Sequence, residues 1–189
     1  ALTHAVESYI AKTATPQTRS YATISVRLVF EHLLTAFRNG ADLEARQGMA
    51  LASYYGGLAF TRTSVGYVHA IAHNLGAYYG TPHGLANALA LPHVLDFSEQ
   101  AAQRQLAELG EVIGVSGDTD AAKAHAFIDA VRSLAASLEI PTTLEPLSPD
   151  DIPALADLAM AEAFLDYPVP RYMSKSECEG VIAKLLPAA

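Results

Sequence analysis

Residues 66–84 read GYVHAIAHNLGAYYGTPHG and combine a helical pattern with a glycine- and proline-containing break. This run predicts a short helix over 67–79, then a turn, and a second helix that starts at His83. His69 and His73 are four residues apart, so a helix places both imidazoles on one face. A reversal of the chain at the turn brings His83 back toward His69. We therefore expect a cluster of histidines here.

Helical periodicity continues through nearly the whole chain, and no series of alternating strands is present. We expect one all-α domain of about eight to ten helices. Seven of the ten prolines lie in residues 141–189, which predicts short helices joined by ordered turns in that region. Before it, helices are expected over 1–14, 17–38, 42–61, 67–79, 83–97, 98–112 and 119–138.

Several residues are expected at helix boundaries. Asp42 and Ser98 can each cap the helix that follows, and Asp118 or Thr119 can cap a later one. Proline removes a backbone donor and clashes with the preceding turn. Pro92 is therefore expected to kink its helix or to end the first half of it.

Composition excludes several classes of protein. With 189 residues, 51% hydrophobic and 17% charged, the chain can form one ordinary domain or two small ones, and it is not disordered. Its single cysteine, Cys178, excludes a disulfide scaffold and indicates a reducing compartment, so we expect a cytoplasmic protein. The net charge of −8 argues against nucleic acid or an anionic membrane as the main partner. No apolar stretch is long enough to span a bilayer.

The first residues predict that the sequence is a fragment. The chain begins with ALTH, without a methionine, and Leu2, Ala5, Val6 and Tyr9 have helical spacing from the first turn. A helix that starts with no capping residue suggests an upstream segment that is not represented.

The histidines of residues 66–84 fit a metal site. A neutral imidazole is a metal ligand, and the positive end of a helix dipole disfavours imidazolium, so the helix start at His83 suits a ligand. Nitrogen donors favour Zn or Fe(II). The pattern differs from the HExxH motif of zinc proteases, because Ala70 follows His69. From spacing alone, these residues can equally be ordinary histidines of a core or a helix surface, and for His73 that interpretation is favoured.

Other candidates carry weaker signals. His32 fits packing and His125 an exposed helix position better than ligation. His93 follows Pro92 and is ambiguous: packing is favoured over a place beside the metal ligands. Cys178 lies between two glutamates and lacks a basic neighbour that would lower the pKa of its thiol, so it is a poor nucleophile. The chain contains no G-x-S-x-G elbow and no G-x-G-x-x-G loop after a strand. It therefore does not hold most of a nucleotide cofactor.

Four segments resemble the iron-containing (group III) alcohol dehydrogenases: 1–7 (ALTHAVE), 40–46 (GADLEAR), 66–88 and 91–94 (LPHV). The resemblance is strongest over residues 1 to about 97. It implies the multi-helical C-terminal domain of that family, which is of the dehydroquinate synthase-like type. Residues 1–189 would then be a single helical, metal-binding catalytic domain, and the family's N-terminal nucleotide-binding α/β domain would be absent.

The resemblance also implies roles for individual residues. His4, His69 and His83 match the three histidines that hold the family's metal, which is Fe(II), with Zn also compatible. The family's fourth ligand is an aspartate that would fall immediately ahead of Ala1, outside this sequence. His73 matches a histidine that is not a ligand but lies near the substrate and the nicotinamide, where it could act as a general base.

Some positions depart from the family or leave a role open. The family's late Asn-Pro-Arg turn is replaced by Val169-Pro170-Arg171, so no catalytic role is assigned to it. Phe60, Asn74 and Tyr78 are candidate pocket residues, and each is equally compatible with simple packing.

The activity implied is hydride transfer between an alcohol and NAD or NADP, with reduction of an aldehyde or ketone in reverse. The expected partners are a small alcohol or aldehyde and an upstream nucleotide-binding domain, and an Ala-rich helical domain also allows a homo-oligomer. We expect the 189 residues alone to fold but not to catalyse the reaction.

Two other interpretations remain open. One alternative is a non-catalytic helical binding or assembly module, with no metal and no contact among His4, His69 and His83. Another is a hydrolase with a bound water, which lacks an obvious general base beside the cluster.

Overall fold

The chain is all-α, as expected. The computed structural model describes residues 1–187, except for the side chains of residues 165 and 166. Within that range it contains nine α-helices, one short 3-10 helix and no strand. The helices are α1 (Leu2–Ile10), α2 (Pro16–Arg38), α3 (Leu43–Thr63), α4 (Tyr67–Tyr79), α5 (His83–Ser98), α6 (Gln103–Val112), α7 (Asp120–Ser137), the 3-10 helix η1 (Pro149–Asp151), α8 (Ile152–Asp166) and α9 (Lys175–Ala183).

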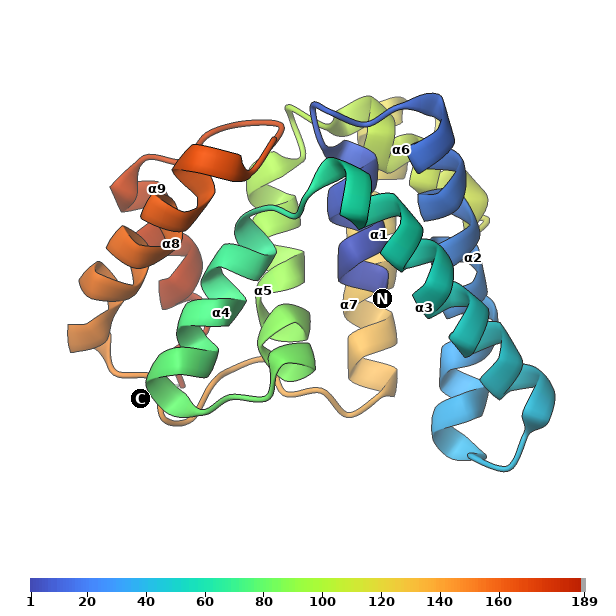
Figure 1. The fold of residues 1–189 in the computed structure, drawn as a ribbon, viewed down its shortest axis with the longest axis horizontal. Coiled ribbons are helices and arrows are strands. Elements are labelled where there is room, and N and C mark those ends of the chain that lie inside the picture. Colours follow the sequence, from blue (N-terminus) through green and yellow to red (C-terminus); the bar gives the residue numbers. More distant parts are fainter. Residues whose placement is uncertain (188–189) are drawn as a thin grey trace.

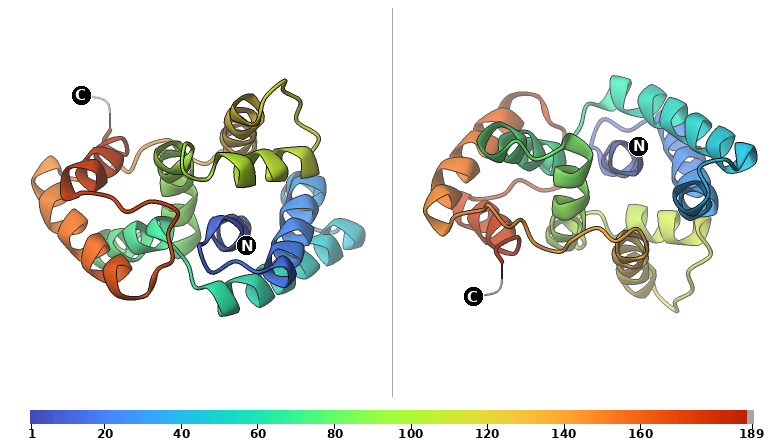
Figure 2. Two further views of the ribbon diagram at one scale, coloured as in Figure 1. Left: turned by 90° about the horizontal axis from the view of Figure 1, so that it is seen from above. Right: turned by 90° about the horizontal axis from the view of Figure 1, so that it is seen from below.

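Helix α1 is enclosed by other helices. Figure 2 shows it end-on, and it contacts α2, α3, α5 and α6. Seven of its nine residues are buried, including the polar Glu7 and Ser8. A helix that is buried all round must find partners for its polar groups inside the protein. Ser8 accepts a hydrogen bond from Thr63, at 2.9 Å, and Glu7 reaches across to α4.

The C-terminal helices form a second group around α4 and α5 (Figure 1). Helix α8 packs against α4, and α9 packs against both α8 and α5. Helix α4 ends at Gly80, which adopts the left-handed conformation (φ 65°) that glycine tolerates at a helix C-terminus. The chain then runs back to start α5 at His83. This reversal, which the sequence predicted, brings the first turn of α5 close to α4.

Several predicted boundaries are confirmed and others are wrong. Asp42 and Thr119 cap α3 and α7 through their side chains. Ser98 is not a cap: it is the buried last residue of α5, and α6 starts only at 103. Helix α1 ends at 10 rather than 14. Hydrophobic spacing in this segment continues past the last residue whose backbone is helical, Ile10.

Two prolines, Pro92 and Pro153, do not shorten their helices as the sequence predicted. Helix α5 continues through Pro92 to its end at Ser98, so the proline does not terminate it. Helix α8 has 15 residues and is not short, because Pro153 lies in its first turn. There the missing N–H would have no intrahelical partner in any case. None of the helices in the described part of the chain is long and apolar enough to cross a membrane.

The long helices α2 and α3 lie side by side (Figure 1), and Gly48 permits their close approach. A Cβ added at Gly48 would lie 2.2 Å from the His32 ring of α2, whereas one added at Gly57 would meet nothing within 4 Å. We expect Gly48→Ala to lower the free energy of unfolding by about 1–3 kcal/mol through overpacking. Gly57→Ala should raise it by up to about 1 kcal/mol through helix propensity. Urea denaturation of both variants checks this, and equal stabilities would contradict it.

Candidate metal centre

Three histidines from three helices converge on one point. One ring nitrogen from each of His4, His69 and His83 lies within 4.8 Å of the others. The Nε2 atoms of His4 and His69 are 3.1 Å apart, and the rings of His69 and His83 have centroids 5.4 Å apart. His4 lies on the first turn of α1, His69 on the first turn of α4, and His83 begins α5. Local spacing predicted that His69 and His83 lie together, the family resemblance added His4, and the fold brings the three side chains together.

The His4 ring contacts an aromatic side chain as well as the His69 ring. Phe60 of α3 stacks on it, with ring centroids 4.2 Å apart and planes inclined by 28°. Burial, followed by the charge of His69, lowers the pKa of His4 to about 3. The imidazole is therefore neutral at neutral pH, and one of its ring nitrogens keeps a lone pair available for an ion.

His69 is the buried member of the cluster, and a carboxylate holds it. Its Nδ1 lies 2.5 Å from Oε2 of Glu7, and the other Glu7 oxygen accepts the backbone N–H of Val68 at 2.8 Å. Both side chains are almost fully buried. Sequence reasoning did not identify Glu7. The signal was its position three residues after His4, which places the two side chains on the same face of α1.

His83 is the exposed member, at the first position of α5. The side of its ring that packs against the cluster is shielded from water, and this desolvation, followed by its neighbours His69 and His73, lowers its pKa. Asn87, one turn later, places Nδ2 3.2 Å from its Nε2 and donates to its backbone carbonyl at 2.9 Å. Oδ1 of Asn87 is buried and has no hydrogen-bond partner within the described residues. A polar group beside the cluster thus keeps spare hydrogen-bonding capacity.

His73 lies beside the cluster rather than within it. Its ring stacks on the His83 ring, with centroids 5.3 Å apart and planes inclined by 17°. Its Nδ1 lies 2.7 Å from Oε1 of Glu162 on α8, and the hydroxyl of Tyr167 donates to the same oxygen at 2.5 Å. The His73 side chain is 43% exposed. The ring thus lies between the cluster and solvent in part, and it is oriented by Glu162, a carboxylate that the sequence analysis did not identify.

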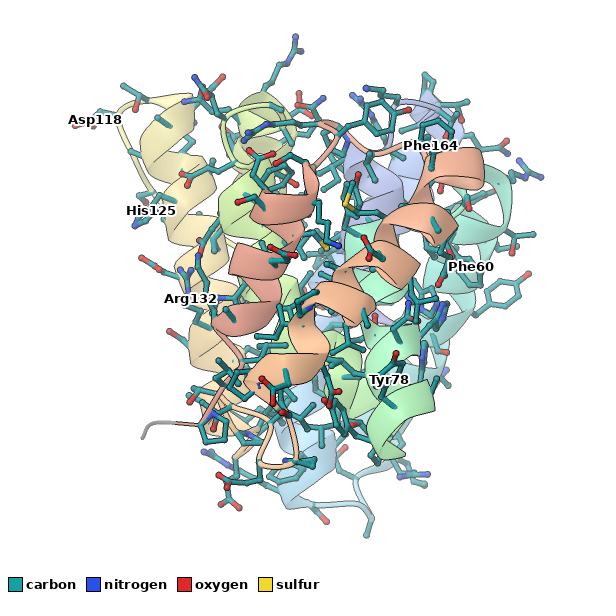
Figure 3. The ribbon with its side chains drawn as sticks, turned by 90° about the vertical axis from the view of Figure 1, so that its left-hand side faces the viewer. Phe60, Tyr78, Asp118, His125, Arg132 and Phe164 are labelled. Atoms are coloured by element: carbon teal, nitrogen blue, oxygen red, sulfur yellow. The ribbon has the colours of Figure 1, made fainter. Side chains whose placement is uncertain are left out.

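The other histidines lie away from this centre. His125 is exposed on α7, on the side of the molecule opposite to Phe60 and Tyr78 (Figure 3). His32 packs against Gly48, and His93 is partly buried with a pKa lowered mainly by that burial. These positions agree with the packing or surface roles expected of them.

Further candidates also have structural roles. Burial raises the pKa of the Cys178 thiol to about 12, so it is a poor nucleophile, as predicted. Arg171 pairs with Glu177 and lies over the Phe97 ring at 4.3 Å. The Asn74 side chain donates to the carbonyl of Ala70, one turn earlier in the same helix.

The donor set fits a divalent transition metal. Three imidazole nitrogens gathered from separate helices, one deeply buried and one with a strongly lowered pKa, are the chemistry that Zn and Fe(II) accept. The fold and the cluster thus define a class: an all-α domain with a candidate mononuclear metal site. The chain belongs to the iron-containing alcohol dehydrogenase family, since the model described as "Fe-containing alcohol dehydrogenase family, C-terminal" matches residues 1–186.

Similar proteins agree with this membership. The chain is 40% identical to a 1,3-propanediol dehydrogenase of Citrobacter freundii over 166 residues, which cover 86% of this chain and 43% of that protein. It is 40% identical to an NAD-dependent methanol dehydrogenase of Bacillus methanolicus over 144 residues, 75% of this chain and 38% of that one. A solved 1,3-propanediol oxidoreductase superposes with a TM-score of 0.94 at 35% identity, over 98% of this chain and 49% of that chain. The chain thus spans less than half the length of these relatives.

Proposed function

We propose that this chain is the metal-holding helical half of an NAD(P)-dependent alcohol dehydrogenase. The enzyme would transfer hydride between a small alcohol and NAD or NADP, and would reduce an aldehyde or ketone in reverse. The observation that carries the proposal is the convergence of His4, His69 and His83 within 4.8 Å. The printed names of the relatives support the alcohol substrate and, for the methanol dehydrogenase, NAD.

The proposed ligands of the ion are His4, His69 and His83, and the proposed ion is Fe(II), with Zn also compatible with nitrogen donors. When bound, a divalent cation lowers the pKa of a coordinated hydroxyl and polarises a carbonyl, and the nicotinamide carries the redox change. The dinucleotide is assigned to a separate N-terminal domain. The described residues contain no strand followed by a glycine-rich phosphate loop, which such a cofactor needs.

His73 is the proposed proton carrier. If Glu162 accepts the Nδ1 proton, Nε2 of His73 is left with a lone pair and can accept the proton of an alcohol hydroxyl. The exposed ring can then pass this proton to water. Tyr167, which donates to the same Glu162 oxygen, helps to keep that carboxylate in place.

The proposed substrate is small. An open depression on the surface is lined by Phe60, Thr61, Ser64, Val65 and Tyr167. It adjoins the cluster through Phe60, which stacks on His4, and it adjoins the proton carrier through Tyr167. The names of the relatives, which are dehydrogenases of 1,3-propanediol, methanol and butanol, support a short alcohol or aldehyde.

The alternatives are less well supported. A non-catalytic module predicts no contact among the three histidines, whereas the Nε2 atoms of His4 and His69 are 3.1 Å apart. A hydrolase was disfavoured because no obvious general base was found beside the cluster. The carboxylates that lie there are already engaged: Glu7 is buried against Val68 and His69, and Glu162 contacts His73 and Tyr167. The dehydrogenase remains preferred because the relatives are named as dehydrogenases. We also propose a cytoplasmic location. We further propose that the chain can form a homo-oligomer, and light scattering would measure the molar mass of the particle in solution.

The proposal predicts that the 189 residues bind a metal but do not turn over. Elemental analysis after loading with Fe(II) or Zn(II) should find about one ion per chain. Assays of alcohol oxidation with NAD and NADP should show no rate, because the hydride acceptor lacks a binding domain. An upstream-extended version of the chain should restore the rate. Appreciable turnover by the short chain would contradict the two-domain assignment, and absence of metal would contradict the site.

A further inference from the structure

We propose that Glu7 is a positioning residue of the metal centre: it holds His69 in the tautomer with hydrogen on Nδ1, so that Nε2 offers its lone pair to the ion. This inference rests on the proposed metal site. Ring nitrogens of histidine ligands are commonly oriented by such an outer partner. No role was assigned to Glu7 by sequence reasoning, and its side chain does not belong to the three-histidine cluster.

The hydrogen-bonding roles follow from which groups can donate. The backbone N–H of Val68 can only donate, so Oε1 of Glu7 accepts from it, at 2.8 Å. An ionised carboxylate has only acceptors, so a ring nitrogen within hydrogen-bond distance of Oε2 must be the donor. The group facing it, at 2.5 Å, is Nδ1 of His69. Nδ1 therefore carries the hydrogen, and in neutral His69 the lone pair is on Nε2, which is the atom facing His4.

The start of α4 stabilises the carboxylate in this position. The N-cap of α4 is Gly66, which has no side chain and makes no capping hydrogen bond. Val68, the second residue of α4, gives its otherwise unpaired N–H to Glu7 instead. The carboxylate thus caps α4 from another helix, at the end where the helix dipole favours a negative charge. The same contact joins α1 and α4, the helices that carry His4 and His69.

The glycine at the cap also provides the space that Glu7 occupies. A Cβ at Gly66 would lie 2.8 Å from Oε1 and 3.3 Å from the carboxyl carbon of Glu7. Any larger residue would push the carboxylate away from Val68 and His69. The sequence Val65-Gly66-Tyr67 therefore both starts α4 and admits the group that orients the first ligand on it.

The decisive variant is Glu7→Gln, which keeps the shape of the side chain. If the amide oxygen accepts from Val68, its NH2 group faces Nδ1 of His69 and donates to it. His69 must then carry its hydrogen on Nε2, which blocks the ligating lone pair. The matched control is Glu108→Gln, because Glu108 accepts a hydrogen bond from Tyr9 of the same helix α1, at 2.8 Å, outside the cluster.

Two measurements test the proposal on the 189-residue chain. Nitrogen-15 NMR of the metal-free wild type should show His69 protonated at Nδ1, and Glu7→Gln should shift this hydrogen to Nε2. Calorimetry with Zn(II) should show affinity reduced roughly 10- to 100-fold in Glu7→Gln, as for other outer partners of metal ligands. Glu108→Gln should match wild type. Gly66→Ala, which displaces Glu7 without changing its charge, should weaken binding in the same direction.

The outcomes separate this inference from the proposed function. A wild-type His69 protonated at Nε2, which needs no variant to measure, would overturn the role of Glu7. So would a folded Glu7→Gln chain that binds Zn(II) as tightly as wild type. If wild type binds no Zn(II), the metal site itself is overturned, while an Nδ1 hydrogen on His69 would still support Glu7 as the group that sets the tautomer.

Discussion

Replacing His69 with alanine is expected to reduce the affinity of the chain for Zn(II) or Fe(II) by more than about 100-fold, beyond the effect typical of outer partners. His69 is the only buried one of the three proposed ligands, and its Nε2 lies 3.1 Å from the His4 ring nitrogen. Its removal takes away one donor and leaves the Glu7 carboxylate without its ring partner. Calorimetry with each ion, beside circular dichroism to confirm folding, measures the effect.

The matched control is His125→Ala, since His125 is an exposed histidine on α7 far from the cluster. It should bind metal as wild type does. His4→Ala and His83→Ala should each weaken binding, since each removes one of the converging nitrogens. If His69→Ala and His125→Ala bound the ion equally well, the ion would have to lie elsewhere, and the dehydrogenase assignment would lose its main support.

Replacing Phe127 with alanine is expected to cause a large loss of stability. Phe127 on α7 is fully buried, lies near the Phe30 ring with centroids 6.4 Å apart, and packs against the backbone at Gly110. Truncating a buried phenylalanine costs about 3–5 kcal/mol through lost burial and the cavity left behind. Domains of this kind have total stabilities of about 5–15 kcal/mol, so the midpoint of thermal unfolding should fall by on the order of 10 °C.

Phe164→Ala provides the control for this prediction. Phe164, on α8, is 78% exposed, so its removal should change the free energy of unfolding by less than about 0.5 kcal/mol. Urea or thermal unfolding of both variants in the metal-free chain compares them directly. A small loss in Phe127→Ala, no larger than that expected for Phe164→Ala, would mean that α7 does not pack against α2 and α6 as described.

The helices illustrate how far periodicity reaches. The capping residues Asp42 and Thr119 were found because a capping hydrogen bond is local and needs only a few residues of sequence. The start of α6 was placed five residues too early, because Ser98 resembles a cap but is buried inside α5. Whether a serine caps a helix depends on which helix its backbone has already joined, and that is settled by packing.

Local sequence determined the helical class, the turn at Gly80, the shared face of His69 and His73, and the return of His83, because these depend on residues close together in the chain. Only the tertiary structure decided that Glu7 orients His69 and that Glu162 contacts His73. These pairs are separated by 62 and 89 residues. Periodicity shows which face of a helix is buried, but the packing of the whole chain decides which other helix that face meets.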